Sequence, residues 1–227
     1  MRISYNTNRI ETFISNYVGD FVLYEYLVER YRPGEPIICS DIKTELSDAT
    51  LRWTLKKLTD TGKLIRLDTG IYCIPKIGRL GQLLLPMPEE VADAKYIRRN
   101  NKVSGYFSGL LFANQLGLTT QLPNELEIVT NIAVNPVRRI SLCGRDMIVR
   151  KPTAEITEAN SSVLRLLDIL RDYDKYSELS VCEAEKKVSA YITEKEIRQS
   201  DFDKYLSAYP DKTFRTVYEM RLYNVLA

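Results

Sequence analysis

Residues 47–74 read SDATLRWTLKKLTDTGKLIRLDTGIYCI, and this stretch decides the fold of the N-terminal part of the chain. In its first half, leucine recurs every three or four residues, at Leu51, Leu55 and Leu58. This spacing predicts a helix over Ala49–Asp60 with one apolar face directed at a core. Ser47-Asp48 offers a cap at the start of the helix, and Gly62 ends it.

The second half of this stretch predicts a hairpin, because two β-rich runs, residues 63–67 and 71–74, flank the turn residues Asp68-Thr69-Gly70. Upstream, the pattern predicts three more elements: a helix, a short strand and a brief helix, over Asp20–Tyr31, Pro36–Cys39 and Ile42–Leu46. The order helix, strand, helix, helix, hairpin predicts a winged helix-turn-helix within residues 1–78.

Charge is distributed unevenly along this predicted domain. Ser47–Arg79 contains seven basic and three acidic residues, whereas Asp20–Leu46 contains three basic and six acidic ones. Lysine and arginine replace counterions along DNA phosphates, so this polarity predicts a DNA-binding face on the third helix and the hairpin. The net charge of the whole chain is only +2, so affinity for DNA must come from this local cluster. The predicted DNA-binding residues are Thr50, Arg52, Trp53, Lys56, Lys57, Lys63 and Arg66.

Within this set we expect Arg52 and Lys56 to reach the major groove or its rim, and Lys63 and Arg66 to contact phosphate or minor groove from the hairpin. Two alternatives stay open. The basic residues of the third helix could be an ordinary solvated face, and many winged helices are protein-interaction modules without specific DNA binding. Trp53 could pack on another domain or on a partner instead of lying against DNA.

The composition argues against most enzyme classes. The chain has no histidine, which removes the commonest general base and the usual catalytic triad. Neither a P-loop nor a G-x-G-x-x-G segment occurs. The four cysteines are scattered without a C-x-x-C pair, so we expect reduced thiols rather than a zinc site. We therefore expect a protein that is not an enzyme and holds neither cofactor nor metal.

Hydropathy predicts no association with a membrane. No apolar run approaches the ~20 residues that span a bilayer, and the N-terminal residues MRISYNTNRIETF lack the apolar core of a signal peptide. We therefore expect a cytoplasmic protein.

A second, mixed α/β domain is predicted over residues 79–178. It begins within a connector at Gly78–Pro88, whose leucines suggest that the connector is packed. Its expected helices cover Pro88–Asn100, Phe107–Leu116 and residues 160–173, the last with Val163, Leu166, Leu167 and Leu170 facing inward. Its expected strands cover Glu125–Asn131, Arg138–Cys143 and Met147–Lys151.

The segment SGLLFANQLGLTTQLPNELEIVTN, followed by RRISLCGRDMIVRKP and a helix containing LRLLDIL, resembles the AbiEi-type antitoxin and transcriptional-regulator family of bacterial type IV toxin–antitoxin systems. The resemblance covers about Asp20–Tyr173, and its most specific part is Leu116–Pro123 with Thr130 and the hairpin at Gly144-Arg145. Better-known members often carry a histidine near Asn114–Gln115, which this chain lacks.

This resemblance implies an α+β protein in which a winged helix-turn-helix precedes an antitoxin-like α/β domain. It also implies a regulator that binds its own promoter and opposes a nucleotidyltransferase-like toxin encoded by the adjacent gene. Because winged-helix regulators often bind paired half-sites, a homodimer is compatible with this prediction.

Residues 179–227 form a charged, helix-rich segment with helices expected at Val181–Ile192, Ser200–Ala208 and Lys212–Leu226. The last two are separated by Pro210-Asp211. Tyrosines are plentiful here, and they are expected either to pack on the rest of the chain or to form a surface for a partner or a dimer.

Overall fold

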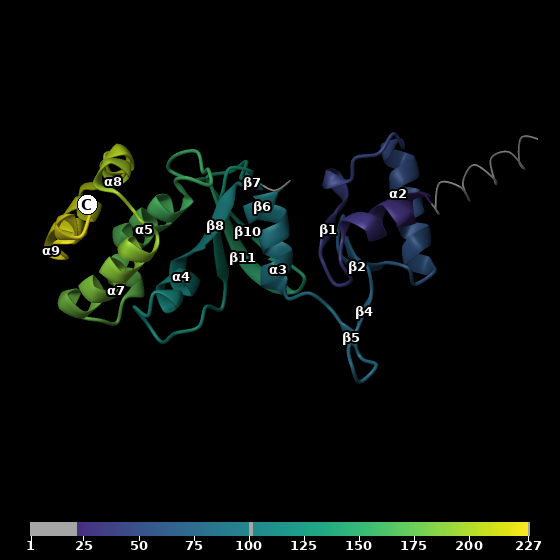
Figure 1. The fold of residues 1–227 in the computed structure, drawn as a ribbon, viewed down its shortest axis with the longest axis horizontal. Coiled ribbons are helices and arrows are strands. Elements are labelled where there is room, and N and C mark those ends of the chain that lie inside the picture. Colours follow the sequence, from purple (N-terminus) through teal and green to yellow (C-terminus); the bar gives the residue numbers. More distant parts are fainter. Residues whose placement is uncertain (1–21, 100–101, 227) are drawn as a thin grey trace, which may run out of the picture. The chain divides into compact units, whose positions relative to one another are not determined.

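The computed structural model describes residues 22–99 and 102–226 (Figure 1). These described residues fold as two compact units, which are divided between Val91 and Ala92. The architecture combines helices with mostly antiparallel sheets, as expected for an α+β protein. In the part of the chain that the structure describes, no helix combines the length and the apolar character required to span a bilayer.

The first unit contains a helix over residues 22–30, strand β1 (Ile37–Ile38), a 3-10 turn η1 (Cys39–Asp41) and helix α2 (Asp48–Asp60). Strands β2 (Ile65–Asp68) and β3 (Ile71–Cys73) follow. The three strands form one antiparallel sheet in the order β1-β3-β2, in which Ile37 pairs with Tyr72 and Ile65 pairs with Cys73. The predicted hairpin is therefore confirmed.

Helix α2 forms for the reasons that its sequence indicates. The Ser47 hydroxyl accepts a hydrogen bond from the Thr50 amide at 3.2 Å, which caps the helix. Leu51, Leu55 and Leu58 are buried in one hydrophobic core with residues of the first helix and the sheet. Gly62 follows the helix with a φ of +72°, a backbone conformation that glycine adopts without strain.

The helix expected over Ile42–Leu46 is wrong. The chain makes only the single turn η1, and Ile42 is already extended, with φ −73° and ψ 111°. The Leu46 amide donates to the Thr44 hydroxyl at 3.2 Å, and the backbone reaches the cap of α2 without forming a helix. The first two residues of the helix expected over Asp20–Tyr31 lie outside the described residues.

Strands β4 (Lys76–Ile77) and β5 (Leu83–Leu84) form a small hairpin after this sheet. It occupies the connector that was expected to be packed, but its side chains at Leu80 and Leu83–Leu85 are exposed. The leucines of this segment therefore do not carry the packing that their hydropathy suggested.

The chain continues through helix α3 (Pro88–Ala92), the π-helical turn η2 (Asp93–Ile97), and strands β6 (Arg98–Arg99) and β7 (Lys102–Val103). The helix expected over Pro88–Asn100 thus ends at Ile97. Its basic end is wrong because Arg98 and Arg99 pair with Val103 and Lys102 as a hairpin, while Asn100 lies outside the described residues.

The second unit is built on a four-stranded sheet in the order β10-β11-β9-β8. Its members are β8 (Gly105–Ser108), β9 (Leu126–Thr130), β10 (Val137–Leu142) and β11 (Arg145–Arg150). Strands β9 and β11 run parallel, and the other pairs are antiparallel. Helix α4 (Gly109–Gln115) starts two residues later than expected because Phe107 and Ser108 complete β8.

Figure 1 shows α4 and helix α5 (Ser161–Arg171) on one side of this sheet, and η2 contacts β8 and β9. The inward positions predicted for α5, including Val163 and Leu166, are buried. The remaining elements are helical: α6 (Tyr173–Tyr176), α7 (Val181–Glu194), α8 (Gln199–Leu206), α9 (Asp211–Glu219) and η3 (Leu222–Asn224).

These C-terminal helices share one hydrophobic core with the sheet, since buried side chains from Tyr106 to Leu226 belong to the same cluster. The observed division at residues 91 and 92 differs from the expected boundaries after residues 78 and 178. The physical reason is packing: α8 and α9 bury Phe202 and Val217 in the core that α5 lines, so they belong to the second unit.

Candidate nucleic-acid interface

The outward face of α2 presents Arg52, Trp53 and Lys56, all of them exposed. They point away from the core because the leucines of the same helix occupy the opposite face. Arg52 and Lys56 are one turn apart and therefore lie on the same stripe of the helix. The structure thus places two cations side by side on the surface at the positions that the sequence indicated.

Thr50 and Lys57 flank this stripe and are half-buried. The Thr50 hydroxyl shares a 2.8 Å hydrogen bond with the Ser47 hydroxyl, so it belongs to the helix cap. The Lys57 ammonium lies 5.1 Å from the centre of the Trp53 ring, a cation–π contact. Trp53 keeps 46% of its surface exposed. Its ring is therefore supported on one side and available on the other.

The hairpin contributes Lys63 and Arg66, which are both exposed. The Lys63 ammonium lies 4.9 Å from the centre of the Tyr24 ring, which anchors the start of the hairpin to the first helix. The Arg66 Nε donates a 3.3 Å hydrogen bond to the Asp68 carbonyl. Both side chains are thus partly ordered by contacts within the unit while their charges face solvent.

Arg52 also affects η1 electrostatically. Burial raises the pKa of the Cys39 thiol, and the Arg52 guanidinium opposes this increase. The Arg52 guanidinium therefore lies close enough to Cys39, the first residue of η1, to affect its thiol. This places positive charge where α2 meets the sheet.

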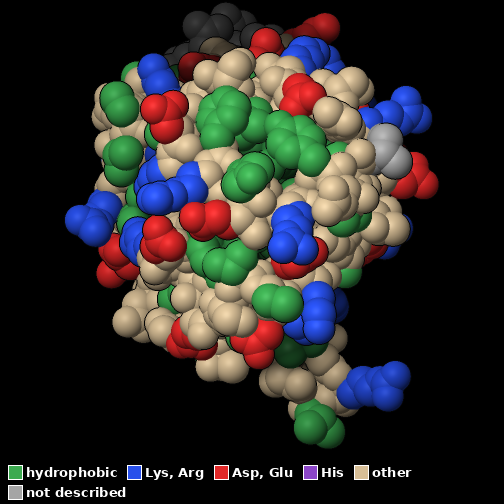
Figure 2. Space-filling view, turned by 90° about the vertical axis from the view of Figure 1, so that its left-hand side faces the viewer, with side chains coloured by type: hydrophobic (Ala, Val, Ile, Leu, Met, Phe, Trp, Pro, Cys, Tyr) green, Lys and Arg blue, Asp and Glu red, His purple; other side chains and the backbone are tan. Residues whose placement is uncertain are grey.

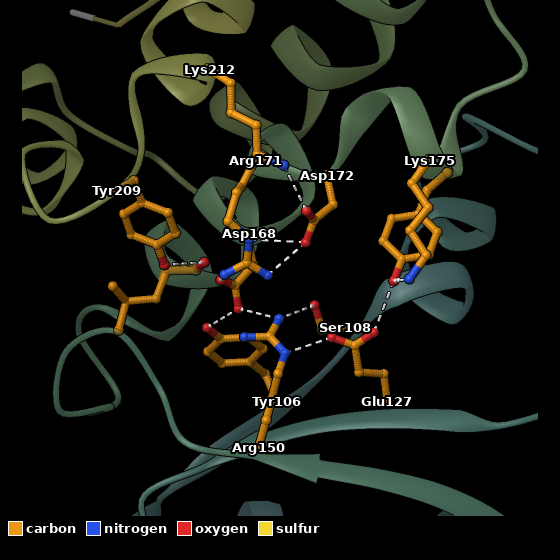
Figure 3. A network of polar contacts seen from close by, with 12 residues as sticks. Tyr106, Ser108, Glu127, Arg150, Asp168, Arg171, Asp172, Lys175, Tyr209 and Lys212 are labelled. Atoms are coloured by element: carbon orange, nitrogen blue, oxygen red, sulfur yellow. Dashed lines mark hydrogen bonds and ion pairs between the residues drawn. The ribbon is translucent and has the colours of Figure 1, made fainter. Parts of the chain in front are cut away.

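A second candidate functional site lies in the other unit, where a polar network surrounds Asp168 on α5 (Figure 3). The Asp168 side chain is 0% exposed and forms ion pairs with Arg150 at 3.0 Å and Arg171 at 3.1 Å. The Tyr106 hydroxyl donates to the same carboxylate at 2.7 Å. Burial raises the pKa of Tyr106 strongly, and the Asp168 charge adds to this increase. Tyr106 is therefore a hydrogen-bond donor, not an acid, at neutral pH.

The network extends in two directions from Asp168. Towards the sheet, Arg150 pairs with Glu127 at 2.6 Å, and the Tyr176 hydroxyl donates to Glu127 at 3.0 Å. Towards the C-terminal helices, Asp172 accepts from Arg171 at 2.7 Å and from Lys212 at 3.1 Å. Burial alone would raise the pKa of Asp172, but its hydrogen bonds to Arg171 and Lys212 outweigh this and lower it.

The charged groups of this network pair with one another, so its chemistry is that of a cross-link between β9, β11, α5 and α9. None of its residues is among the predicted site residues. One signal was present: Asp168 interrupts the apolar run LRLLDIL, and a charge on a buried helix face requires partners. The partners themselves are far away in sequence.

The remaining expectations concern cysteine and metal. Cys73 is buried, Cys39 and Cys143 are half-buried, and Cys182 is exposed. Among the residues that the structure describes, no cluster of carboxylates and cysteines is arranged to hold a metal ion.

Comparison with known proteins gives a family for this chain. No curated protein matches it. A family model described as a family of unknown function, DUF6088, matches residues 28–199, which includes α2, the β2–β3 hairpin and the sheet of the second unit. Because this match extends over most of the chain, the protein belongs to the DUF6088 family.

Proposed function

We propose that the first unit is a winged helix-turn-helix that binds double-stranded DNA, with α2 as the recognition helix and the β2–β3 hairpin as the wing. The observation that carries this proposal is the pair Arg52 and Lys56, exposed on the face of α2 opposite its buried leucines. A helix with this pattern can enter the major groove while its apolar face stays in the core.

The arrangement of the unit supports the proposal. The β2–β3 hairpin comes directly after α2 in the sequence. In the sheet order β1-β3-β2, strand β3 of this hairpin pairs with β1, the short strand that precedes α2. The single turn η1 stands where a second helix was expected. The proposed domain is therefore a winged helix with a shortened helix-turn-helix.

Four basic side chains would contact different parts of the DNA. Arg52 and Lys56 reach base edges or the groove rim, and Lys63 and Arg66 contact phosphate from the wing. Contacts to Tyr24 and the Asp68 carbonyl already restrict Lys63 and Arg66, so ordering them on DNA costs less conformational entropy. Trp53, backed by Lys57, offers an aromatic surface to the sugar–phosphate backbone.

The biological role that we propose is a cytoplasmic transcriptional regulator that autoregulates its operon as an AbiEi-like antitoxin. This rests on the resemblance of Leu116–Pro123, Thr130 and the Gly144-Arg145 turn to that family. Two of these positions hold the fold together: the Thr130 hydroxyl donates to the Tyr96 carbonyl at 2.6 Å, and Arg145 donates to the Pro123 carbonyl at 2.5 Å. The proposed antagonist is a nucleotidyltransferase-like toxin encoded by the adjacent gene.

Fluorescence anisotropy with the full-length protein tests DNA binding. The probe is a labelled duplex from the region upstream of the protein's own gene, and the competitor is an unrelated duplex. The variant Arg52→Ala/Lys56→Ala is compared with Lys186→Ala/Arg198→Ala, which removes the same charge from exposed positions in the second unit.

We expect Arg52→Ala/Lys56→Ala to weaken binding by at least tenfold and to reduce the salt dependence of the affinity. We expect the control variant to bind like the wild type. Unchanged binding by Arg52→Ala/Lys56→Ala would refute the assignment of this face. A wild-type protein that binds the protein encoded by the adjacent gene but no DNA would favour the interaction-module alternative.

A further inference from the structure

Helix α9 turns aromatic side chains towards solvent. Tyr218 is 80% exposed and Phe214, one turn earlier, is 43% exposed. The opposite side of the helix is anchored, because Val217 and Met220 are buried in the core of the second unit. Figure 2 shows hydrophobic side chains gathered on this face of the molecule, with charged side chains among them. Exposure here is thus not a consequence of a loosely attached helix.

Tyr223, on η3 directly after α9, is a third exposed aromatic side chain of this C-terminal segment, at 42%. Its ring packs edge-on against Phe202 at 6.4 Å, and its hydroxyl donates to Asp203 at 2.9 Å. Tyr223 is therefore held in place. In the part of the chain that the structure describes, the side chains of Phe214 and Tyr218 make no comparable ring contact or hydrogen bond. We call Phe214, Tyr218 and Tyr223 the aromatic face.

Charges beside the aromatic face form an ordered pair. The Arg215 Nε lies 3.3 Å from the Glu219 carboxylate, and both side chains are exposed. The acid is at the C-terminal end of α9, where the helix dipole disfavours negative charge, and the base precedes it, which is the weaker order for such a pair. The stability of the isolated helix therefore does not account for this arrangement.

We propose that the aromatic face binds a second copy of this chain, with the two α9 helices antiparallel about a two-fold axis. In that arrangement Phe214 of one copy lies level with the partner's Tyr218. Arg215 then lies about 3 Å along the helix axis from the partner's Glu219, which is within reach of its long side chain. When two identical helices run in opposite directions, the cation of each copy lies near the anion of the other copy. The mixed charge of the rim thus favours a second copy over a partner of one sign.

The size of the surface sets the strength of the dimer. Large aromatic side chains bury ~150–250 Å² each, so the aromatic face supplies on the order of 300 Å² per copy at its observed exposure. A stable interface buries about 800 Å² per partner. The aromatic face is therefore the centre of a modest interface, completed by its charged rim, and we expect dissociation in the micromolar range. The inference concerns association without DNA and does not depend on the proposed DNA-binding face.

Sedimentation equilibrium of the full-length protein without DNA, from 1 to ~200 µM, tests the proposal. We expect a monomer–dimer equilibrium for the wild type. Tyr218→Ser should weaken dimerisation at least tenfold, because a truncated aromatic anchor typically costs more than 1.4 kcal/mol. Leu122→Ser, which changes another exposed apolar side chain of the second unit, is the control and should leave the equilibrium unchanged.

Charge reversal identifies the two-fold arrangement. R215E alone and E219R alone should each weaken the dimer, since each brings like charges close together across the two-fold axis. The double variant R215E/E219R should recover most of the wild-type affinity. Circular dichroism of each variant checks that the fold is retained. A wild type that stays monomeric at the highest concentration overturns the proposal, and so does a dimer that is insensitive to Tyr218→Ser or is not rescued by the double variant.

Discussion

Replacing Asp168 by asparagine tests whether the buried network holds the second unit together. The carboxylate is fully buried between two guanidinium groups and the Tyr106 hydroxyl. Asparagine keeps the shape but removes the charge, so Arg150 and Arg171 lose their shared counter-ion in a desolvated place. Breaking a buried ion pair by removing one partner costs about 3–5 kcal/mol. We expect the lower end of this range, because Glu127 and Asp172 still pair with the two arginines.

Urea denaturation with two probes measures this loss. The chain has a single tryptophan, Trp53 in the first unit, so its fluorescence reports that unit, whereas far-ultraviolet circular dichroism is dominated by the helices of the second. With an m-value of about 2 kcal/mol per molar urea, a loss of about 3 kcal/mol moves the midpoint by about 1.5 M. The circular dichroism transition should shift by this amount, while the Trp53 transition should stay where it is.

Asp174→Asn serves as the control, because Asp174 is exposed on α6 and lies outside the network. Its substitution should change the stability by less than about 0.5 kcal/mol. If Asp168→Asn shifts the midpoint no more than Asp174→Asn does, the network does not stabilise the unit and the reasoning fails.

Three further predictions concern the cap of α2, acid stability and the cysteines. Ser47→Ala should cost about 1 kcal/mol by Trp53 fluorescence, and Ser47→Asp should restore most of it; equal stability of all three proteins would contradict the cap. The pKa of Asp172 is lower in the folded protein than the value of about 3.9 in the unfolded chain. The ionised carboxylate therefore contributes its full stabilisation above about pH 4, and this contribution is lost as the pH falls through the folded-state pKa. The stability difference between the wild type and Asp172→Asn should therefore shrink below about pH 4, and a difference independent of pH would argue against the Arg171 and Lys212 contacts. Ellman's reagent should modify exposed Cys182 first and buried Cys73 only on unfolding, so reaction of Cys73 in the folded protein would contradict this prediction.

Part of the fold is determined by residues that are close together in the sequence. Helix α2, the β2–β3 hairpin and the β10–β11 hairpin follow from apolar spacing and turn residues within a few positions of each other, so their prediction succeeded. The prediction of a helix over Ile42–Leu46 was wrong. Five residues give only a weak helical pattern, and the Ser47 cap of α2 requires an extended backbone directly after them. The strand at Arg98–Arg99 was missed because two residues are too few to show an alternating pattern.

The sequence by itself determined the face of α2: the positions of three leucines require that Arg52 and Lys56 point outward, whatever the rest of the chain does. Only the tertiary structure decided that Glu127, Arg150 and Asp168 meet, since the parallel pairing of β9 with β11 and the packing of α5 bring together residues from three separate elements. The physical reason is range. Helical periodicity acts over three or four residues, whereas buried charges find their partners only after distant segments have collapsed around them.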